Sequence, residues 1–85
     1  MKVSEDEVNA AIVAEHYHRF PGTTSTACCL VLYNGMSAVG SSGCVDPAEY
    51  NEQMGKDIAR RDAFGKVWAY LGFKLAEKLH LQKEG

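Results

Sequence analysis

A helical pattern runs without interruption through the C-terminal half of the chain, and it limits the fold more than any other feature of the sequence. Asp46 is a helix-capping residue, and Pro47 suits the first helical position after it. Helical spacing then continues to about Leu79. A helix of roughly 34 residues would be about 50 Å long, more than a compact chain of this size can cover. We therefore expect a helix that overhangs the domain, or a kink near Gly65 or Gly72.

One face of this predicted helix is apolar. Its members lie on one stripe at about 100° per residue, and they are Tyr50, Met54, Ile58, Trp68, Leu75 and Leu79. Asp57 and Arg61 fall on the same stripe, four residues apart with the acid first. The two pair with each other at the edge of a core, or Arg61 projects into a recessed site and binds an anion. Gly65 and Gly72 share the stripe and favour close approach of a second helix or a ligand, because helical glycine otherwise costs up to about 1 kcal/mol.

An apolar run before Asn34-Gly35 predicts a β-hairpin. The two strands would span Cys28 to Tyr33 and Met36 to Ser42. Asn-Gly between two such runs favours a two-residue type I′ turn, which places Tyr33 opposite Met36. The first strand is apolar on both faces, so helices or another subunit must cover it.

The N-terminal segment begins with a capping box, formed by Ser4 and Glu7. We expect a first helix from about Glu5 to about His18, ended by the Phe20-Pro21-Gly22 segment. The element order is then helix, hairpin, long helix, which is an α+β fold in a single domain covering residues 1–85. So small a core is marginal on its own, and we therefore expect a homo-oligomer.

Composition excludes several classes of protein. The net charge of −2 argues against binding to DNA or RNA polymers. The longest apolar run, Ala27 to Tyr33, is too short to cross a bilayer. The chain has an odd number of cysteines, Cys28, Cys29 and Cys44, which fits a reduced compartment. Its first residues are polar, so no secretion signal is expected. We therefore expect a cytoplasmic protein with no membrane partner.

The sequence shows no convincing catalytic or metal constellation. On a helix, His16 and His18 would point about 200° apart and could not share an ion. There is no Cys-x-x-Cys spacing and no phosphate-loop or dinucleotide fingerprint. No acid–base pair or nucleophile stands out, so a small enzyme acting on nucleotides is the least favoured hypothesis. We expect no catalytic residues, no metal and no cofactor.

Several segments resemble a known family. They are Tyr33 to Met36, Ser41 to Pro47, Ile58 to Trp68, and Ala14 to Tyr17. Over roughly residues 30–73 the chain resembles the gene-product 49/66 family of small tailed-phage proteins. That family is similar to the phage anti-Thoeris proteins, which sequester cyclic ADP-ribose signals and in some cases cyclic oligonucleotides. The resemblance implies a non-catalytic, oligomeric phage or prophage protein that counters host defence in the host cytoplasm.

The resemblance also implies a set of ligand-binding residues on the hairpin and the long helix. Cations would hold phosphates, flat side chains would pack on a base, and hydroxyl or amide groups would bond its edges. The cations are Arg60, Arg61 and Lys66, and the side chain that packs on a base is Tyr33 or Met36. The hydroxyl and amide groups belong to Asn34, Ser41 and Ser42. Met36 and Phe64 depart from the family pattern, which usually has an aromatic residue at the first position and often a second arginine at the other. The alternative function is a module that binds or inhibits a host protein, which would leave an apolar face exposed.

Overall fold

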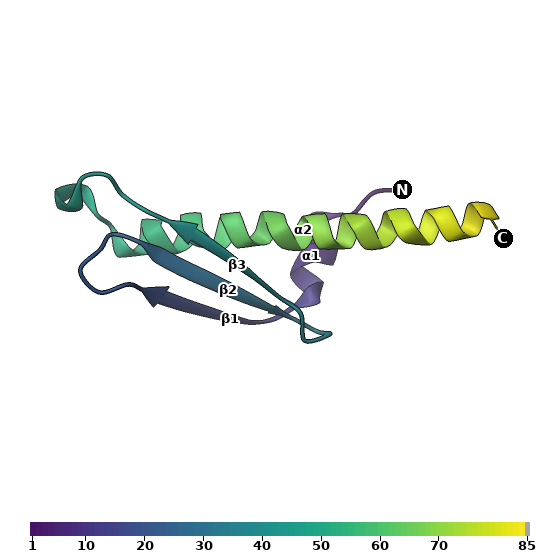
Figure 1. Ribbon diagram of the computed structural model, residues 1–85, viewed down its shortest axis with the longest axis horizontal. Helices are drawn as coiled ribbons and strands as arrows, with labels where there is room; N and C mark the ends of the chain where they lie inside the picture. The colour runs from purple at the N-terminus through teal and green to yellow at the C-terminus, as the bar shows by residue number, and fades with distance from the viewer. Residues whose placement is uncertain (85) are drawn as a thin grey trace.

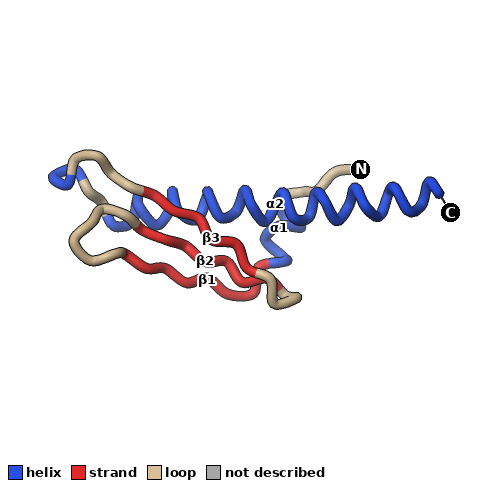
Figure 2. Tube along the Cα trace, viewed as in Figure 1, coloured by secondary structure: helices blue, strands red, loops and turns tan. Residues whose placement is uncertain are grey.

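The structure, a computed structural model, describes residues 1–84. Its elements are α1 (Glu5–Ala11), β1 (Ile12–Arg19), β2 (Thr26–Leu32), β3 (Ser37–Ser42), the short 3₁₀ helix η1 (Pro47–Glu49) and α2 (Glu52–Glu84). The strands form one antiparallel sheet in the order β1-β2-β3, and α2 runs along the sheet (Figures 1 and 2). The predicted α+β fold with a hairpin and a long C-terminal helix is confirmed, with a third strand added.

The predicted first helix is wrong beyond Ala11. The capping box forms as expected, since the Ser4 hydroxyl accepts from the Glu7 amide and the Glu7 carboxylate accepts from the Ser4 amide. The helix ends after Ala11, however, and Ile12–Arg19 is a strand paired with β2. The strand begins at β-branched residues, which pack well in sheets. Its pairing makes β2 the central strand, and this suits a segment that is apolar on both faces.

The loop between β2 and β3 has three residues, so the predicted type I′ turn is wrong. The Gly35 amide donates to the Leu32 carbonyl, and the Leu32 amide donates to the Met36 carbonyl. Gly35 has a φ of 88°, whereas no non-glycine residue within 1–84 has a positive φ. A type I′ turn needs positive φ at both central residues, while a three-residue loop needs one residue, here Gly35, in that conformation.

This loop shifts the strand register by one residue from the predicted pairing. Leu30 lies opposite Ala38, and Cys28 lies opposite Gly40. A shift of one residue exchanges the faces of a strand. Ala38 and Gly40 therefore join the face of β2 that is covered by α2, and both are buried.

The side of α2 that meets the sheet consists of small residues. Ala59, Ala63 and Val67 are completely buried. A side chain at Gly40 would overlap the Ala63 amide nitrogen and the Ala59 carbonyl oxygen, so the helix backbone rests directly on β3. The rest of the core comes from the N-terminal segment, α1 and the sheet, namely Val3, Val8, Ala11, Cys28, Leu30, Leu32 and Ala38.

Met54, Ile58 and Trp68 of α2 are turned away from the sheet, whereas Phe64, Leu71 and Leu75 are partly buried against the core. Met54 is 59% exposed, Ile58 42% and Trp68 39%, and a methyl group at Gly65 or Gly72 would meet open space. We call these five residues the bare stripe. The apolar stripe expected from periodicity is therefore divided, because Leu75 packs against the core whereas Met54, Ile58 and Trp68 do not. The small residues on the opposite side of α2 allow the closer approach to the sheet.

α2 is continuous from Glu52 to Glu84, with no break at either internal glycine. The predicted start at Asp46 belongs instead to η1, where the Asp46 side chain accepts from the Ala48 amide. In the first turn of α2 the Asn51 side chain accepts from the Met54 amide. Asp46 thus caps a helical turn as predicted, but that turn is the separate short helix η1 and not the start of α2.

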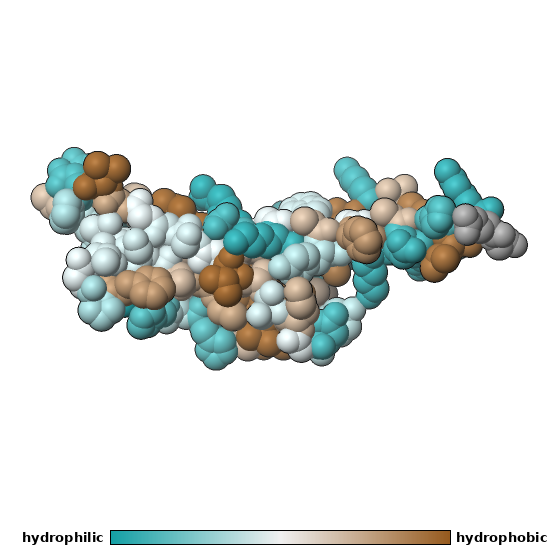
Figure 3. Space-filling view, viewed as in Figure 1, coloured by the Kyte–Doolittle hydropathy of each residue, from teal (hydrophilic) through white to brown (hydrophobic). Residues whose placement is uncertain are grey.

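The molecule is long and narrow, and its C-terminal end projects beyond the sheet (Figure 1). Its extents are 57 × 21 × 18 Å and its radius of gyration is 15.8 Å, whereas a compact domain of this length has about 12 Å. Polar and apolar side chains alternate along the projecting part (Figure 3). None of the described helices is both long enough and apolar enough to cross a membrane.

Candidate anion-binding site

A hollow of about 300 Å³ lies on one flank of α2 and contains two arginines. Its walls are Asp57, Arg60, Arg61 and Phe64 from α2, with Glu5 from the first turn of α1. The spacing of the four α2 residues places them on adjacent turns of one helix flank. The Arg60 guanidinium lies 5.4 Å from the centre of the Phe64 ring. The hollow therefore combines two cations, two carboxylates and one aromatic surface.

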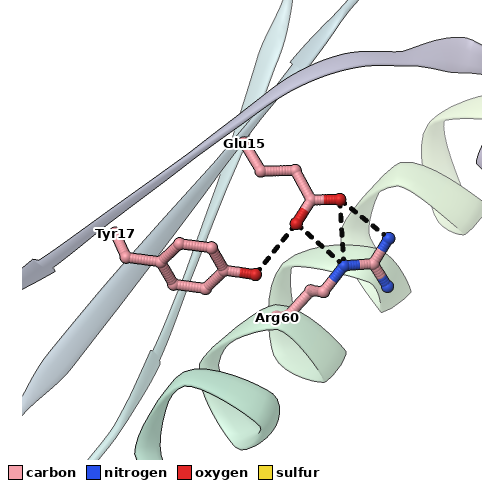
Figure 4. Close-up of polar contacts among 3 residues, drawn as sticks. All are labelled: Glu15, Tyr17 and Arg60. Carbon is pink, nitrogen blue, oxygen red and sulfur yellow. Dashed lines mark hydrogen bonds and ion pairs between the residues drawn. The ribbon is translucent and has the colours of Figure 1, made fainter. Parts of the chain in front are cut away.

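Arg60 is held by a residue of β1 (Figure 4). Its Nε donates to both carboxylate oxygens of Glu15, at 3.2 and 3.1 Å, and its Nη2 donates to Oε2 at 3.0 Å. The Tyr17 hydroxyl donates to Glu15 Oε1 at 2.9 Å. Glu15 and Tyr17 are two residues apart on a strand, so both face α2.

The electrostatics of this group follow from its hydrogen bonds and from partial burial. The hydrogen bond from Arg60 lowers the pKa of Glu15, and the same bond raises the pKa of Arg60. Burial, followed by the bond to Glu15, raises the pKa of Tyr17. Burial also raises the pKa of the Cys28 thiol. At neutral pH Glu15 and Arg60 are thus charged, and Tyr17 and Cys28 keep their protons.

Arg61 has no hydrogen-bond or ion-pair partner within residues 1–84, and its side chain is exposed beside the hollow. The predicted pair with Asp57 does not form, because the Asp57 carboxylate accepts from the Gln53 amide at 2.9 Å. Arg61 thus lies at a recess without the Asp57 pair, and the binding of an anion there stays a prediction. Arg61 is the uncommitted cation of the hollow.

Three of the other residues named from the resemblance lie at the loop between β2 and β3. Tyr33 and Met36 are about half exposed there. The Asn34 side chain accepts from the Met36 amide, which stabilises the turn. The Tyr33 hydroxyl accepts from Lys74 of α2 at 2.7 Å. These residues are at the end of the sheet, apart from the hollow and outside its walls.

Ser41, Ser42 and Lys66 take part in contacts between β3 and α2. Lys66 Nζ donates to the Val39 carbonyl at 2.6 Å, and the Ser41 amide donates to Asp62 at 3.0 Å. The Ser42 hydroxyl donates to the Gly55 carbonyl at 2.7 Å. All three residues therefore stabilise the packing of the helix on the strand. In one chain, the structure brings together Arg60 and Arg61 and leaves the other six elsewhere.

A second hollow, also of about 300 Å³, lies where β3 leads into α2. Its walls are Thr24, Ser42, Gly43, Cys44, Val45, Glu49, Tyr50, Asn51, Met54, Gly55 and Ile58. The Tyr50 hydroxyl and the Thr26 hydroxyl are buried without a hydrogen-bond partner among the described residues. The Arg19 guanidinium covers the Tyr50 ring at 4.0 Å. This hollow is mainly apolar and holds no uncommitted cation, so it is a weaker candidate for an anion.

Sequence reasoning missed Glu15 and Tyr17 because it placed them on a helix. As strand residues, His16 and His18 also share one face, the outer one, contrary to the helical expectation. Within the described part of the chain, no group of three or more His, Cys, Asp or Glu side chains is arranged to hold a metal. The signal that the sequence does offer is the β-branched pair Ile12-Val13 at the start of the segment, which favours a strand.

Comparison with known proteins identifies the family. The model of the "Phage protein (N4 Gp49/phage Sf6 gene 66) family" matches residues 3–79, nearly the whole chain. No curated protein and no solved structure matches it. The match includes α1, the sheet and all of α2 that packs on it. The chain therefore belongs to the phage protein family of N4 Gp49 and phage Sf6 gene 66.

Proposed function

We propose that this protein is a non-catalytic phage protein that sequesters a cyclic-nucleotide-type immune signal, cyclic ADP-ribose or a cyclic oligonucleotide, in the host cytoplasm. The observation that carries the proposal is the hollow on α2, where the uncommitted Arg61 lies beside Arg60 and the Phe64 ring. Guanidinium groups bind phosphate oxygens in pairs, and aromatic rings stack on bases. Membership of a phage protein family supports the setting.

The two carboxylates of the hollow fit the same class of ligand. Glu5 and Asp57 leave the hollow without a net positive charge, so inorganic phosphate alone would be a poor match. A nucleotide also carries ribose hydroxyls and amino groups, which donate to carboxylates, as acidic residues do for ribose in dinucleotide sites. The mixed lining therefore favours a ligand that has both phosphates and hydrogen-bond donors.

We further propose that the protein works as a homo-oligomer assembled through the bare stripe of α2. The surface area is 5944 Å², whereas a compact monomer of this mass exposes about 5,000 Å². The difference is close to the roughly 800 Å² that each partner buries in a standard interface. Arg61 lies between Ile58 and Gly65 along this stripe, so a second copy would add a wall to the hollow.

Binding is tested by calorimetry and thermal shift with cyclic ADP-ribose isomers and with cyclic di- and trinucleotides. Arg61→Ala is expected to weaken binding by about tenfold or more, since a hydrogen bond to a charged group contributes about 1.5–3 kcal/mol. Lys78→Ala, which removes an exposed cation from the same helix outside the hollow, should leave affinity unchanged. The ligand released by heating should have its original mass, because a binder without catalysis does not alter it.

Two results would count against this function. If folded wild-type protein binds nothing in the panel, the nucleotide proposal fails. If the released ligand has been cleaved, the protein is an enzyme. Assembly is tested by light scattering, where Trp68→Glu on the bare stripe should lower the mass and Phe73→Glu, on another side of α2, should not.

The alternative function, binding to a host protein, is favoured by one observation. On the projecting end of α2, Phe73 is 73% exposed and Leu81 59%, and they flank an open apolar trough beyond the sheet. Apolar surface of this kind often marks a protein-binding site. Capture of one defined host protein that is lost in Phe73→Glu, and is insensitive to nucleotides, would support this alternative.

A further inference from the structure

We propose that Glu15 and Tyr17 are positioning residues that hold Arg60 ready for an anionic ligand in the hollow, an inference that rests on the proposed function. Neither residue lines the hollow. Each would act on the ligand through Arg60, which does line the hollow and is bonded to Glu15. The inference therefore assigns a role to β1, the strand that sequence patterns did not predict.

The geometry of the contact leaves part of the guanidinium available. A guanidinium has five N–H donors. Glu15 engages Nε and Nη2 of Arg60, while Nη1 has no partner within residues 1–84 and points away from the carboxylate (Figure 4). The Arg60 side chain remains 33% exposed. The carboxylate thus fixes one edge of the fork and leaves Nη1 for a phosphate oxygen.

Tyr17 completes the arrangement from the other side of Glu15. Its hydroxyl donates to Oε1, so the carboxylate is held between a donor from its own strand and the guanidinium from α2. Burial keeps Tyr17 protonated and hence a donor. An arginine fixed before the ligand arrives loses less conformational entropy on binding. Replacing outer residues that orient a metal ligand changes metal affinity by about tenfold or more, and we expect a comparable effect of positioning here.

The opposite role for Glu15 makes a different prediction. If the carboxylate were a competing anion that a ligand must displace, removing its charge would strengthen binding. If it positions Arg60, removing the charge would weaken binding even though the hollow becomes more positive. The sign of the change in affinity therefore separates the two roles.

The test measures the affinity of cyclic ADP-ribose and of the cyclic di- and trinucleotides for Glu15→Gln and Tyr17→Phe. Glu15→Gln is expected to weaken binding by about tenfold, and Tyr17→Phe by a smaller factor. The matched control is Glu52→Gln, which breaks a different ion pair of α2, with Lys56 at 3.6 Å, and should leave affinity unchanged. Unfolding curves at the same protein concentration show whether each variant keeps its fold.

A second readout does not need the ligand. An arginine-selective dicarbonyl reagent, followed by peptide fragmentation, reports the reactivity of Arg60 and Arg61 separately. We expect Arg60 to react more slowly than Arg61 in the wild type and to approach its rate in Glu15→Gln. Equal rates in the wild type would overturn the inference, and so would unchanged or tighter binding by Glu15→Gln. Absence of binding by the wild type would overturn the proposed function as well.

Discussion

Replacing Gly40 with alanine tests how closely α2 rests on β3. A methyl group there would lie 2.9 Å from Ala63 Cα and nearer still to the Ala63 amide and the Ala59 carbonyl. Ordinary contact begins at about 3.4 Å, and the obstructing atoms are backbone, so no side chain can rotate away. The helix must retreat by roughly 1 Å or tilt, which weakens dispersion contacts along the interface.

The expected cost is at the upper end of the range for overpacked cores, about 3 kcal/mol. For a domain of this size, each 1 kcal/mol lowers Tm by about 4–8 °C, so the variant should melt about 12–24 °C lower. The free energy of unfolding is measured by urea titration with circular dichroism at 222 nm. Protein concentration is held constant, because the proposed assembly would make stability depend on it.

The control is Gly43→Ala, in the loop after β3, where the added methyl would lie 3.7 Å from the Ser25 hydroxyl in ordinary contact. Its effect should stay within about 0.5 kcal/mol. If Gly40→Ala also costs less than 1 kcal/mol, α2 does not lie on this strand as described. The result would then favour the register of the two-residue turn, which places position 40 on the opposite face from Leu30.

Three further outcomes are expected. Leu30→Ala, at a fully buried position, should lower the free energy of unfolding by about 2–5 kcal/mol in the same urea assay. Gly35→Ala should cost about 1–2 kcal/mol because φ is 88° there, and Gly35→Asn should cost less. Arg60 lowers the pKa of Glu15 in the folded state, so its stabilisation is complete above about pH 4.3, the unfolded value, and is lost as pH falls through the lower folded pKa. Urea titrations between pH 3 and 6 should show this slope in the wild type and a smaller one in Glu15→Gln.

Local chemistry was predictable from the sequence. The capping box at Ser4 needs only residues three positions apart, and it forms. Asp46 and Pro47 begin a helical turn, and the periodic pattern after them is helical to Glu84. The strands on both sides of Asn34-Gly35 were also clear, because β-branched and apolar runs around a turn signal have few other solutions.

The remaining features depend on contacts between distant segments. Residues 12–19 follow a helix start, and only pairing with β2 makes them a strand. Asn-Gly is compatible with two loop lengths, and the fit of Ala38 and Gly40 against α2 distinguishes them. Ala59 and Ala63 are only weakly hydrophobic, so the periodicity of large apolar residues indicated the stripe that contains Met54, Ile58 and Trp68 instead.

The candidate site was predictable only in part, for the same reason. Arg60 and Arg61 were named from the helix and the resemblance, and both line the hollow. The partner of Arg60 lies 45 residues away in the chain, on the unpredicted strand. Lys66 has the same charge as the two arginines, but its ammonium group donates a hydrogen bond to the nearby carbonyl of Val39. Only the three-dimensional neighbours separate a ligand-binding cation from a structural one.

The contacts that Lys66 and Asp62 make with β3 have a consequence for how the sheet can grow. An exposed edge strand invites another chain to add a strand through its free main-chain groups. Here a lysine and an aspartate from the covering helix already occupy a carbonyl and an amide of β3, so an incoming strand would have to displace both. These contacts oppose the addition of a strand at β3, so extension of the sheet is favoured at β1, the opposite edge.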